Sequence, residues 1–222
     1  MGKTAIVIGA TGVVGRALVT KLAASEAFDQ VVTVTRRPDM ASVADENARK
    51  VINHVVDFEQ LDSARHLFQG DCLFSCLGTT LKQAGSVSAQ RRVDLDYQLQ
   101  AAQNASANGV SHYLLVSSSG ANGKSASSYL KMKGELETQI ADLPFKRISV
   151  FQPSLLLGER PDFRLGETLA RWLMPALCWL PGLRRYRPIR GDQVAEKMLQ
   201  VSLQPAEAVQ PEVYTLDKVF PR

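Results

Sequence analysis

The chain has 222 residues, 45% of them hydrophobic and 22% charged, which is enough for one sizeable core. Its 26 basic and 22 acidic side chains leave a net charge of +4, which alone gives no reason to expect a nucleic-acid partner. The three cysteines lack zinc-binding spacing and their odd number argues against a disulfide framework, while the three histidines are scattered. We therefore predict one globular unit, residues 1–222, in a reducing compartment and without a metal.

Two features bear on where the protein resides. The chain begins MGKTAIVIGATG, without the charged leader, long apolar stretch and cleavage site of a secretory signal. Its most apolar stretch, residues 172–183, has twelve residues and contains two prolines, so it is too short and too interrupted to span a bilayer. The sequence predicts a cytoplasmic protein with no transmembrane segment.

Apolar runs rich in β-branched residues alternate with helical patterns along the first two-thirds of the chain. Strands are expected at residues 4–9, 31–35, 51–56, 72–78, 112–118 and 146–152. Helices are expected at residues 13–24, 89–108 and 127–143, and Gly109 is expected to end the second helix. This alternation predicts an α/β fold, a doubly wound parallel sheet with helices on both faces.

The pattern changes after Pro153. Helices at residues 166–177 and 192–203 and a short strand at 212–216 are expected to form a small C-terminal elaboration, with a substrate-side lobe built mainly from residues 154–192. Seven arginines and two acidic residues give residues 160–190 a local charge of +5. The apolar, arginine-rich part of this stretch, 171–190, is compatible with a lid, a dimer surface, a membrane-surface patch, or a packed core with solvated arginines.

The first expected strand runs into the sequence GATGVVG, which opens a helix. Glycines between a strand and a helix permit a tight turn and close approach of the backbone to a dinucleotide, whose pyrophosphate then faces the helix N-terminus. A glycine-rich turn without a ligand is the alternative. The sequence predicts a Rossmann-type cofactor site that includes Gly9, Ala10, Thr11, Gly12, Val13 and Val14.

The second expected strand is followed by Arg36 and Arg37, at the position where an acidic residue would bind the ribose 2′-hydroxyl of NAD. Two guanidinium groups suit a 2′-phosphate, so we predict NADP(H) as the cofactor, the alternative being a solvated basic turn. Asp57 and Phe58 follow the third strand and are candidates to bond and flank the adenine, although aspartate is also common in turns.

The candidate catalytic residues follow the fifth expected strand. Ser117, Ser118 and Ser119 end that strand at the edge of the sheet where such folds bind ligands. Tyr129 and Lys133 come next, one turn apart on a helix, where an ammonium group beside a phenol would favour the phenolate. Lys133 falls on the apolar side of that helix, so it either extends past the core to water or holds a charge beside Tyr129.

Together, GATGVVG, the serine cluster and YLKMK resemble the short-chain dehydrogenase/reductase superfamily, in its extended or atypical branch. Four further segments, FSCLGTTLKQAG, RRVDLDYQLQAA, YLKMKGELE and VFQPSLLLGER, resemble more closely the Tat-interacting-protein oxidoreductase family and its bacterial relatives. The resemblance extends from residue 3 to about residue 201.

This resemblance implies that Tyr129 is the general acid or base, that Lys133 lowers its pKa and bonds the nicotinamide ribose, and that a serine orients the substrate oxygen. Ser119 is the first candidate for that serine and Ser118 the second. The resemblance also implies cofactor contacts from Leu77, Gly78, Thr79, Ser117, Lys133 and Pro153.

The expected function is that of an NADP(H)-dependent oxidoreductase acting on a small carbonyl or alcohol. The alternative is an NADPH-binding regulatory or interaction protein with little or no turnover. Either is compatible with a homodimer or a protein partner, and the sequence does not identify the substrate.

Overall fold

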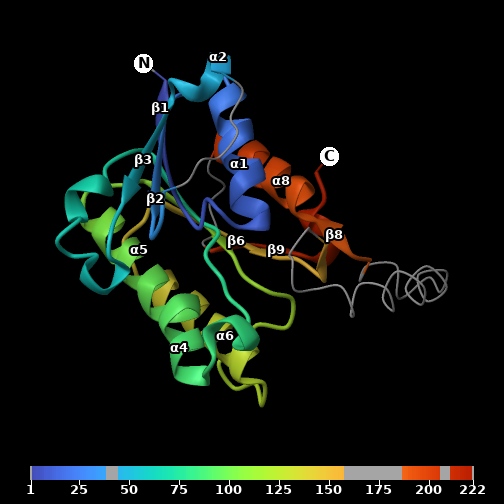
Figure 1. The fold of residues 1–222 in the computed structure, drawn as a ribbon. Coiled ribbons are helices and arrows are strands. Elements are labelled where there is room, and N and C mark those ends of the chain that lie inside the picture. Colours follow the sequence, from blue (N-terminus) through green and yellow to red (C-terminus); the bar gives the residue numbers. More distant parts are fainter. Residues whose placement is uncertain (1, 39–44, 158–186, 206–210, 222) are drawn as a thin grey trace.

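The computed structural model describes residues 2–38, 45–157, 187–205 and 211–221, in which seven parallel strands form a central sheet (Figure 1). The strand order is β3-β2-β1-β4-β5-β6-β9, so the chain changes direction across the sheet between β1 and β4. The strands are β1 (Lys3–Ile8), β2 (Phe28–Thr35), β3 (Val51–Val55), β4 (Cys72–Ser75), β5 (His112–Val116), β6 (Arg147–Gln152) and β9 (Glu212–Thr215). The predicted doubly wound parallel sheet is confirmed.

Helices cover both faces of the sheet because successive side chains of each buried strand point in opposite directions. On β1, Ile6 and Ile8 pack into the core beneath α5 and α6, whereas Ala5 and Val7 pack beneath α1 and α8. Figure 1 shows α1 and α8 side by side, with α5 and α6 on the other side of the sheet. These helices are α1 (Val13–Ala24), α5 (Tyr97–Ala107), α6 (Ser128–Ala141) and α8 (Gly191–Leu203).

The predicted helix at 89–108 is present but is not uniform. It begins as α4 (Val87–Arg91), widens into the π-helical segment η3 (Arg92–Asp96), and continues as α5. Gly109 follows it with φ of 82°, the left-handed conformation expected of the glycine that ends a helix. The π-helical segment was not predicted, because hydrophobic periodicity does not distinguish an α-helical from a π-helical turn over five residues.

Short elements complete the described chain. They are α2 (Asp45–Ala48), α3 (Leu81–Ala84), the 3₁₀ turns η1 (Phe58–Gln60), η2 (Arg65–Leu67) and η5 (Leu216–Val219), and the strands β7 (Leu156–Leu157) and β8 (Ile189–Arg190). The strands β7 and β8 pair with each other in a separate parallel sheet. The connections from β2 to β3 and from β3 to β4 therefore contain short turns of helix, in keeping with their weak helical patterns.

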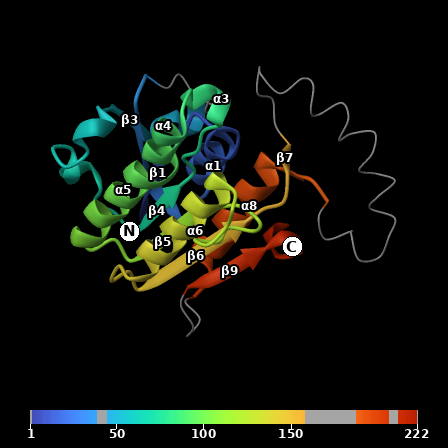
Figure 2. The same ribbon diagram turned by 90° about the horizontal axis from the view of Figure 1, so that it is seen from below.

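The C-terminal elements correct one expectation. The strand predicted at 212–216 is β9, which pairs in parallel with β6 and extends the main sheet (Figure 2). The helix predicted at 192–203 is α8, whose buried residues pack beside α1 on the same face of the sheet. Both elements belong to the main layers, because α8 has an apolar face to bury and β6 has an edge to pair. Residues 166–177, Cys178 and most of 154–192 lie outside the described residues.

Candidate functional site

The glycine turn between β1 and α1 needs glycine at two positions. Gly9 has φ of 75°, and a Cβ there would lie 2.5 Å from the backbone of Cys76 at the end of β4. A Cβ on Gly15 would lie 2.1 Å from the carbonyl oxygen of Gly9, so the first turn of α1 packs directly against the loop. A left-handed φ and such short contacts exclude larger side chains at both positions.

The N-terminus of α1 is suited to an anion. Gly12 is its N-cap, and no side chain in the described part of the molecule caps the first turn, which also lacks acidic residues. The uncapped backbone N–H groups and the positive end of the helix dipole would both favour a negatively charged group. The turn therefore fits the diphosphate of a dinucleotide.

A cavity of about 820 Å³ lies beside this turn. It opens at the carboxyl ends of the adjacent strands β1 and β4, after which the chain continues to opposite faces of the sheet, the position at which open α/β sheets bind ligands. Of the residues predicted to bind the cofactor, the cavity is lined by Gly9, Ala10, Thr11, Gly12, Arg36, Arg37, Phe58, Leu77, Gly78 and Thr79. The sequence did not single out the remaining lining residues, Arg16, Val34, Thr35, Pro38, Cys76, Gln83 and Val93.

Arg16 was missed although its spacing could have revealed it. It follows Gly12 by one helical turn, so it shares a face of α1 with the glycine turn, and it contributes a third guanidinium to the cavity wall beside Arg36 and Arg37. Its Nη2 lies 3.4 Å from the carbonyl oxygen of Thr11. The cavity thus combines three cations with a helix N-terminus, a combination suited to phosphate groups.

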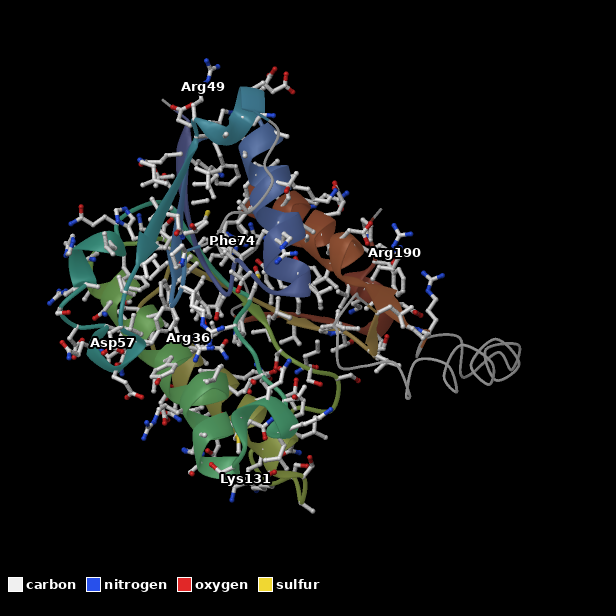
Figure 3. The ribbon with its side chains drawn as sticks, viewed as in Figure 1. Arg36, Arg49, Asp57, Phe74, Lys131 and Arg190 are labelled. Carbon is white, nitrogen blue, oxygen red and sulfur yellow. The ribbon has the colours of Figure 1, made fainter. Side chains whose placement is uncertain are left out.

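Six residues that were predicted to bind the cofactor are not part of the cavity lining in the described structure. They are Val13, Val14, Asp57, Ser117, Lys133 and Pro153. The Asp57 carboxylate accepts the backbone N–H of Glu59 at 2.9 Å and caps η1, a turn role open to aspartate from its position after a strand. Val14 is buried in the core with 5% of its surface exposed. Figure 3 shows Arg36 and Asp57 at a similar height somewhat below the middle of the view, with Arg49 at its top.

Three groups next to Phe58 form a charged cluster beside the cavity. The Tyr97 hydroxyl donates to Glu59 at 2.6 Å, and Arg92 donates to the same oxygen at 2.8 Å. Burial raises the pKa of Tyr97 to about 12, the Glu59 carboxylate adds to that rise, and the positive charges of Arg92 and Arg36 oppose it. Tyr97 also makes an edge-to-face contact with Phe58 at 5.6 Å, so the cluster supports a residue of the cavity wall.

Helix α6 packs in close contact with the serine loop, which we define as residues 117–127. A Cβ on Gly134 would lie 2.3 Å from the backbone of Asn122 and Gly123, so this part of α6 lies directly on the loop. The backbone N–H of Asn122 donates to the carbonyl of Leu130 at 3.0 Å. This packing brings the half-buried Tyr129 to the same edge of the sheet as the serines.

The ends of β5 and β6 meet at that edge. The backbone N–H of Ser119 donates to the carbonyl of Pro153 at 3.0 Å, and the N–H of Ser117 donates to that of Phe151 at 2.7 Å. Ser118 and Ser119 are half-buried, whereas Ser117 is 4% exposed. The structure thus brings together the predicted serines, Pro153 and the helix that carries Tyr129 and Lys133.

Lys133 is buried inside the molecule. Its Nζ lies 3.2 Å from Oδ1 of Asp94, and the two side chains are 3% and 0% exposed. The other oxygen of Asp94 accepts the backbone N–H of Thr79 at 3.1 Å. Lys133 therefore does not extend to water, and a carboxylate that the sequence did not identify holds its charge. The signal for Asp94 was an acidic residue between the apolar residues Val93 and Leu95.

Ser117 is bound to a second buried carboxylate. Its hydroxyl donates to Glu137, which also accepts Nε2 of Gln152 at 3.0 Å. Burial raises the pKa of Glu137, while the bonds from Ser117 and Gln152 and the charge of Lys133 oppose the rise. Because the Ser117 hydroxyl is bound to Glu137, Ser118 and Ser119 stay the candidates for the predicted substrate-orienting serine. Glu137 was also missed, although it follows Lys133 by one helical turn.

The described residues were also searched for a metal site, a membrane-spanning helix and a reactive cysteine. They contain no cluster of three metal-ligating side chains and no helix long and apolar enough to cross a bilayer. Burial raises the pKa of Cys76 to about 12 against the opposing charge of Lys133, so this cavity residue is a neutral thiol. Such a thiol is a poor nucleophile.

The fold, the glycine turn and the cavity define an NAD(P)-binding protein of the Rossmann type, and residues 9–142 match the NAD(P)H-binding family. The chain is 40% identical to Protein HTATIP2 of Rattus norvegicus over 183 residues, which cover 81% of this chain and 74% of that protein. It is 36% identical to the mitochondrial Protein FMP52 of Candida glabrata over 211 residues, which cover 92% of this chain and 87% of the relative. The chain therefore belongs to the family of HTATIP2 and FMP52.

Solved structures share the fold at much lower sequence identity. MoeE5 in complex with UDP-glucose and NAD superposes with a TM-score of 0.70 at 16% identity, covering 97% of this chain and 79% of MoeE5. ChuY, an anaerobillin reductase from Escherichia coli O157:H7, superposes with a TM-score of 0.63 at 17% identity, covering 96% of this chain and 95% of ChuY. At these identities the likeness extends to the fold alone.

Proposed function

We propose that the protein is an NADP(H)-dependent oxidoreductase acting on a small carbonyl or alcohol. The observation that carries this proposal is the packing of α6 on the serine loop, which gathers Tyr129, Lys133 and the serines at the sheet edge that also forms the cofactor cavity. Bound NADPH would supply the hydride. Tyr129 would exchange a proton with the substrate oxygen, and the hydroxyl of Ser119 or Ser118 would hold that oxygen in place.

The preference for NADP(H) over NAD(H) rests on Arg36 and Arg37. Both side chains are exposed and line the cavity after β2, and Arg16 lines the same cavity. Guanidinium groups bind phosphate through charge-assisted hydrogen bonds, so they favour the cofactor that carries a 2′-phosphate. The residues that would hold the cofactor are those of the glycine turn, the two arginines and the loop that contains Leu77, Gly78 and Thr79.

The proposal is tested by following NADPH oxidation against a panel of small aldehydes and ketones. We expect turnover by the wild type and a loss of about a hundredfold or more in Tyr129→Phe, because the positioned proton donor is removed. NADPH binding, followed by fluorescence, should persist in Tyr129→Phe and fail in Gly12→Asp, whose carboxylate would repel the phosphates at the start of α1. Equal turnover by wild type and Tyr129→Phe would exclude this mechanism.

A second function, an NADPH-binding regulatory protein, is favoured by a different observation. Among the described residues, those lining the cavity include neither Tyr129, Lys133 nor the serines, and Lys133 is already paired with Asp94. A protein that binds NADPH tightly but gives no turnover on the carbonyl panel would support this role.

We also propose that the protein is located in the cytoplasm. The FMP52 relatives are named mitochondrial proteins, so the cytoplasm stays a prediction for this chain. Cell fractionation with a tagged full chain would test it.

A further inference from the structure

We propose that Thr35 and Asn53 are positioning residues for the choice of cofactor. The side-chain amide of Asn53 orients the hydroxyl of Thr35, and this hydroxyl holds the arginine turn, residues 36–38, in place beside the cavity. The inference rests on the proposed preference for NADP(H). It adds two side chains to Arg36 and Arg37, and both act through the backbone of the turn.

Thr35 is the last residue of β2 and anchors the arginine turn. Its hydroxyl donates to the carbonyl of Arg37 at 2.7 Å. Its own carbonyl accepts the backbone N–H of Val56 at 2.9 Å, which ties the end of β2 to the chain that follows β3. Thr35 is buried and lines the cavity, whereas Arg36 and Arg37 are exposed. The turn is therefore held at a buried residue while its guanidinium groups stay open to a ligand.

Asn53, on the neighbouring strand β3, determines which way the Thr35 hydroxyl points. Its Nδ2 donates to the hydroxyl oxygen of Thr35 at 2.9 Å and to that of Thr33 at 2.8 Å. An amide N–H group is a donor only, so the Thr35 oxygen accepts this bond and its single proton is left for the carbonyl of Arg37. In the parallel pairing of β2 and β3, Asn53 lies opposite Thr33. The register of these two strands therefore sets the hydrogen bond that holds the turn.

Packing alone does not require hydroxyl groups at the end of β2. Val31, Thr33 and Thr35 alternate along the strand and so point to one face of the sheet, where Val31 belongs to the core beneath α1. Both threonines are buried, and a valine of nearly the same shape would bury no polar group that needs a partner. The two hydroxyls differ in what they contact. That of Thr33 is bonded to Asn53 within the sheet, whereas that of Thr35 also reaches the turn.

Pro38 restricts the arginine turn from its other end. The proline ring disfavours a helical conformation of the preceding residue, Arg37. The backbone of Arg37 is therefore restrained by a ring on one side and by the Thr35 hydroxyl on the other. A binding segment that is already held loses less conformational entropy when its ligand arrives. Only NADPH carries the 2′-phosphate that the arginines would bind, so this gain in affinity applies to NADPH and not to NADH.

The test is the ratio of the affinities for NADPH and NADH, measured by fluorescence titration of the full chain. General damage to the site weakens both cofactors and leaves this ratio unchanged, because both carry the same diphosphate. In Thr35→Val, which removes the hydroxyl, we expect the preference for NADPH to fall about three- to tenfold. Thr35→Ser keeps a hydroxyl and is expected to stay within about twofold of the wild type. An unchanged ratio in folded Thr35→Val would overturn the inference.

The matched control is Thr33→Val, which removes a buried hydroxyl from the same strand. It takes away the other bond of the same Asn53 amide, two residues further from the turn. We expect the ratio of affinities in Thr33→Val to stay at the wild-type value. A fall as large as that in Thr35→Val would show a general response to the loss of a buried hydroxyl and would also overturn the inference.

The role of Asn53 is tested by Asn53→Leu, alone and together with Thr35→Val. Leucine is similar in size but cannot donate, so the Thr35 hydroxyl is no longer oriented and the preference for NADPH should fall about two- to fivefold. In the Thr35→Val background the same substitution should change the ratio by less than about twofold, because the amide acts through the hydroxyl. Equal falls in both backgrounds would contradict the role of Asn53. Asn53→Leu alone also tests the inference if Thr35→Val does not fold, and an unchanged ratio would then overturn it.

These titrations need no turnover, so the two proposals fail separately. Absence of activity on the carbonyl panel counts against the oxidoreductase and leaves the ratio of affinities intact. If Arg36→Ala lowers the preference for NADPH and Thr35→Val does not, the arginines bind the phosphate without help from Thr35, and the positioning role alone fails. A wild type that binds both cofactors equally would overturn the NADP(H) assignment and this inference together.

Discussion

At the scale of single residues, the site depends on charges whose burial differs widely. Lys133 and Asp94 are sealed inside the protein, so each needs the other. Arg36 and Arg37 are exposed at the cavity and are free to meet a ligand from solvent. The buried pair is therefore held by the protein itself, whereas the exposed arginines are open to the phosphate of the cofactor that we propose.

Cofactor choice is the prediction at this scale. In Arg36→Ala, the affinity for NADPH should fall about ten- to a hundredfold relative to NADH, because charge-assisted hydrogen bonds to the 2′-phosphate are lost. Fluorescence titration with both cofactors measures the ratio. Arg49→Ala is the control, since Arg49 is exposed at the top of the view in Figure 3, away from Arg36. An unchanged ratio in both Arg36→Ala and Arg37→Ala would refute the assignment.

At the scale of elements, α6 carries the candidate chemistry and is located by packing on both of its sides. Met132, Leu136 and Ile140 are buried toward the core. Gly134 meets the serine loop with no room for a methyl group. The relative position of Tyr129 and the serines is therefore set by the backbone contact at Gly134, away from the reacting groups.

Gly134→Ala tests this contact. Its Cβ would lie 2.3 Å from the loop backbone, so helix and loop must separate, at a cost of about 1–3 kcal/mol in the free energy of unfolding. We expect a lower kcat for NADPH oxidation as well, because Tyr129 moves relative to the serines. Lys131→Ala, on the exposed side of the same helix, should change stability by less than about 0.5 kcal/mol. Urea unfolding and steady-state rates measure both, and full stability in Gly134→Ala would disprove the contact.

At the scale of the whole molecule, the two ends of the sheet hold different groups of polar residues. The carboxyl ends of the strands form the candidate site, and a buried polar cluster at the other end joins β5, β6, β9 and α8. Arg147 forms paired bonds of 2.9 Å with Glu212 and also donates to the carbonyls of Val201 and Gln204. His112 shares a 2.9 Å hydrogen bond with Ser149 in this cluster.

This cluster predicts sensitivity to acid. Burial, assisted by the positive charge of Arg147, lowers the pKa of His112 to about 3 from an ordinary value of 6.5. Between these two pKa values, His112 is protonated in the unfolded chain but not in the folded protein. The free energy of unfolding therefore falls as pH drops below about 6.5. The loss from this residue is about 1.4 kcal/mol per pH unit down toward its folded pKa.

Urea unfolding between about pH 7 and pH 5 measures the effect. His112→Gln keeps a side chain able to bond Ser149 but cannot be protonated, so its stability should fall less steeply than that of the wild type over this range. His66→Gln, at an exposed histidine, should retain the wild-type slope. If His112→Gln and the wild type have the same slope, His112 is not the group responsible.

Much of the fold could be read from the sequence because its signals are local. Alternating apolar runs and helical patterns marked the six strands through β6, and Gly109 marked the end of α5. The glycine spacing after β1 indicated a cofactor turn, since only glycine permits the backbone conformation at Gly9. The π-helical segment and the position of β9 within the main sheet were not evident, because both depend on what packs against them.

The candidate site likewise has features that local sequence predicts and features that depend on packing. The sequence by itself determined the types of residue available, namely a glycine turn, two arginines, three serines and a Tyr-Lys pair one turn apart. Only the tertiary structure decided which of them are committed to other groups: Asp94 holds Lys133, Glu137 holds Ser117, and Asp57 caps a turn. The reason is physical, since the pairing of buried charges depends on which distant segments the sheet brings within hydrogen-bonding distance.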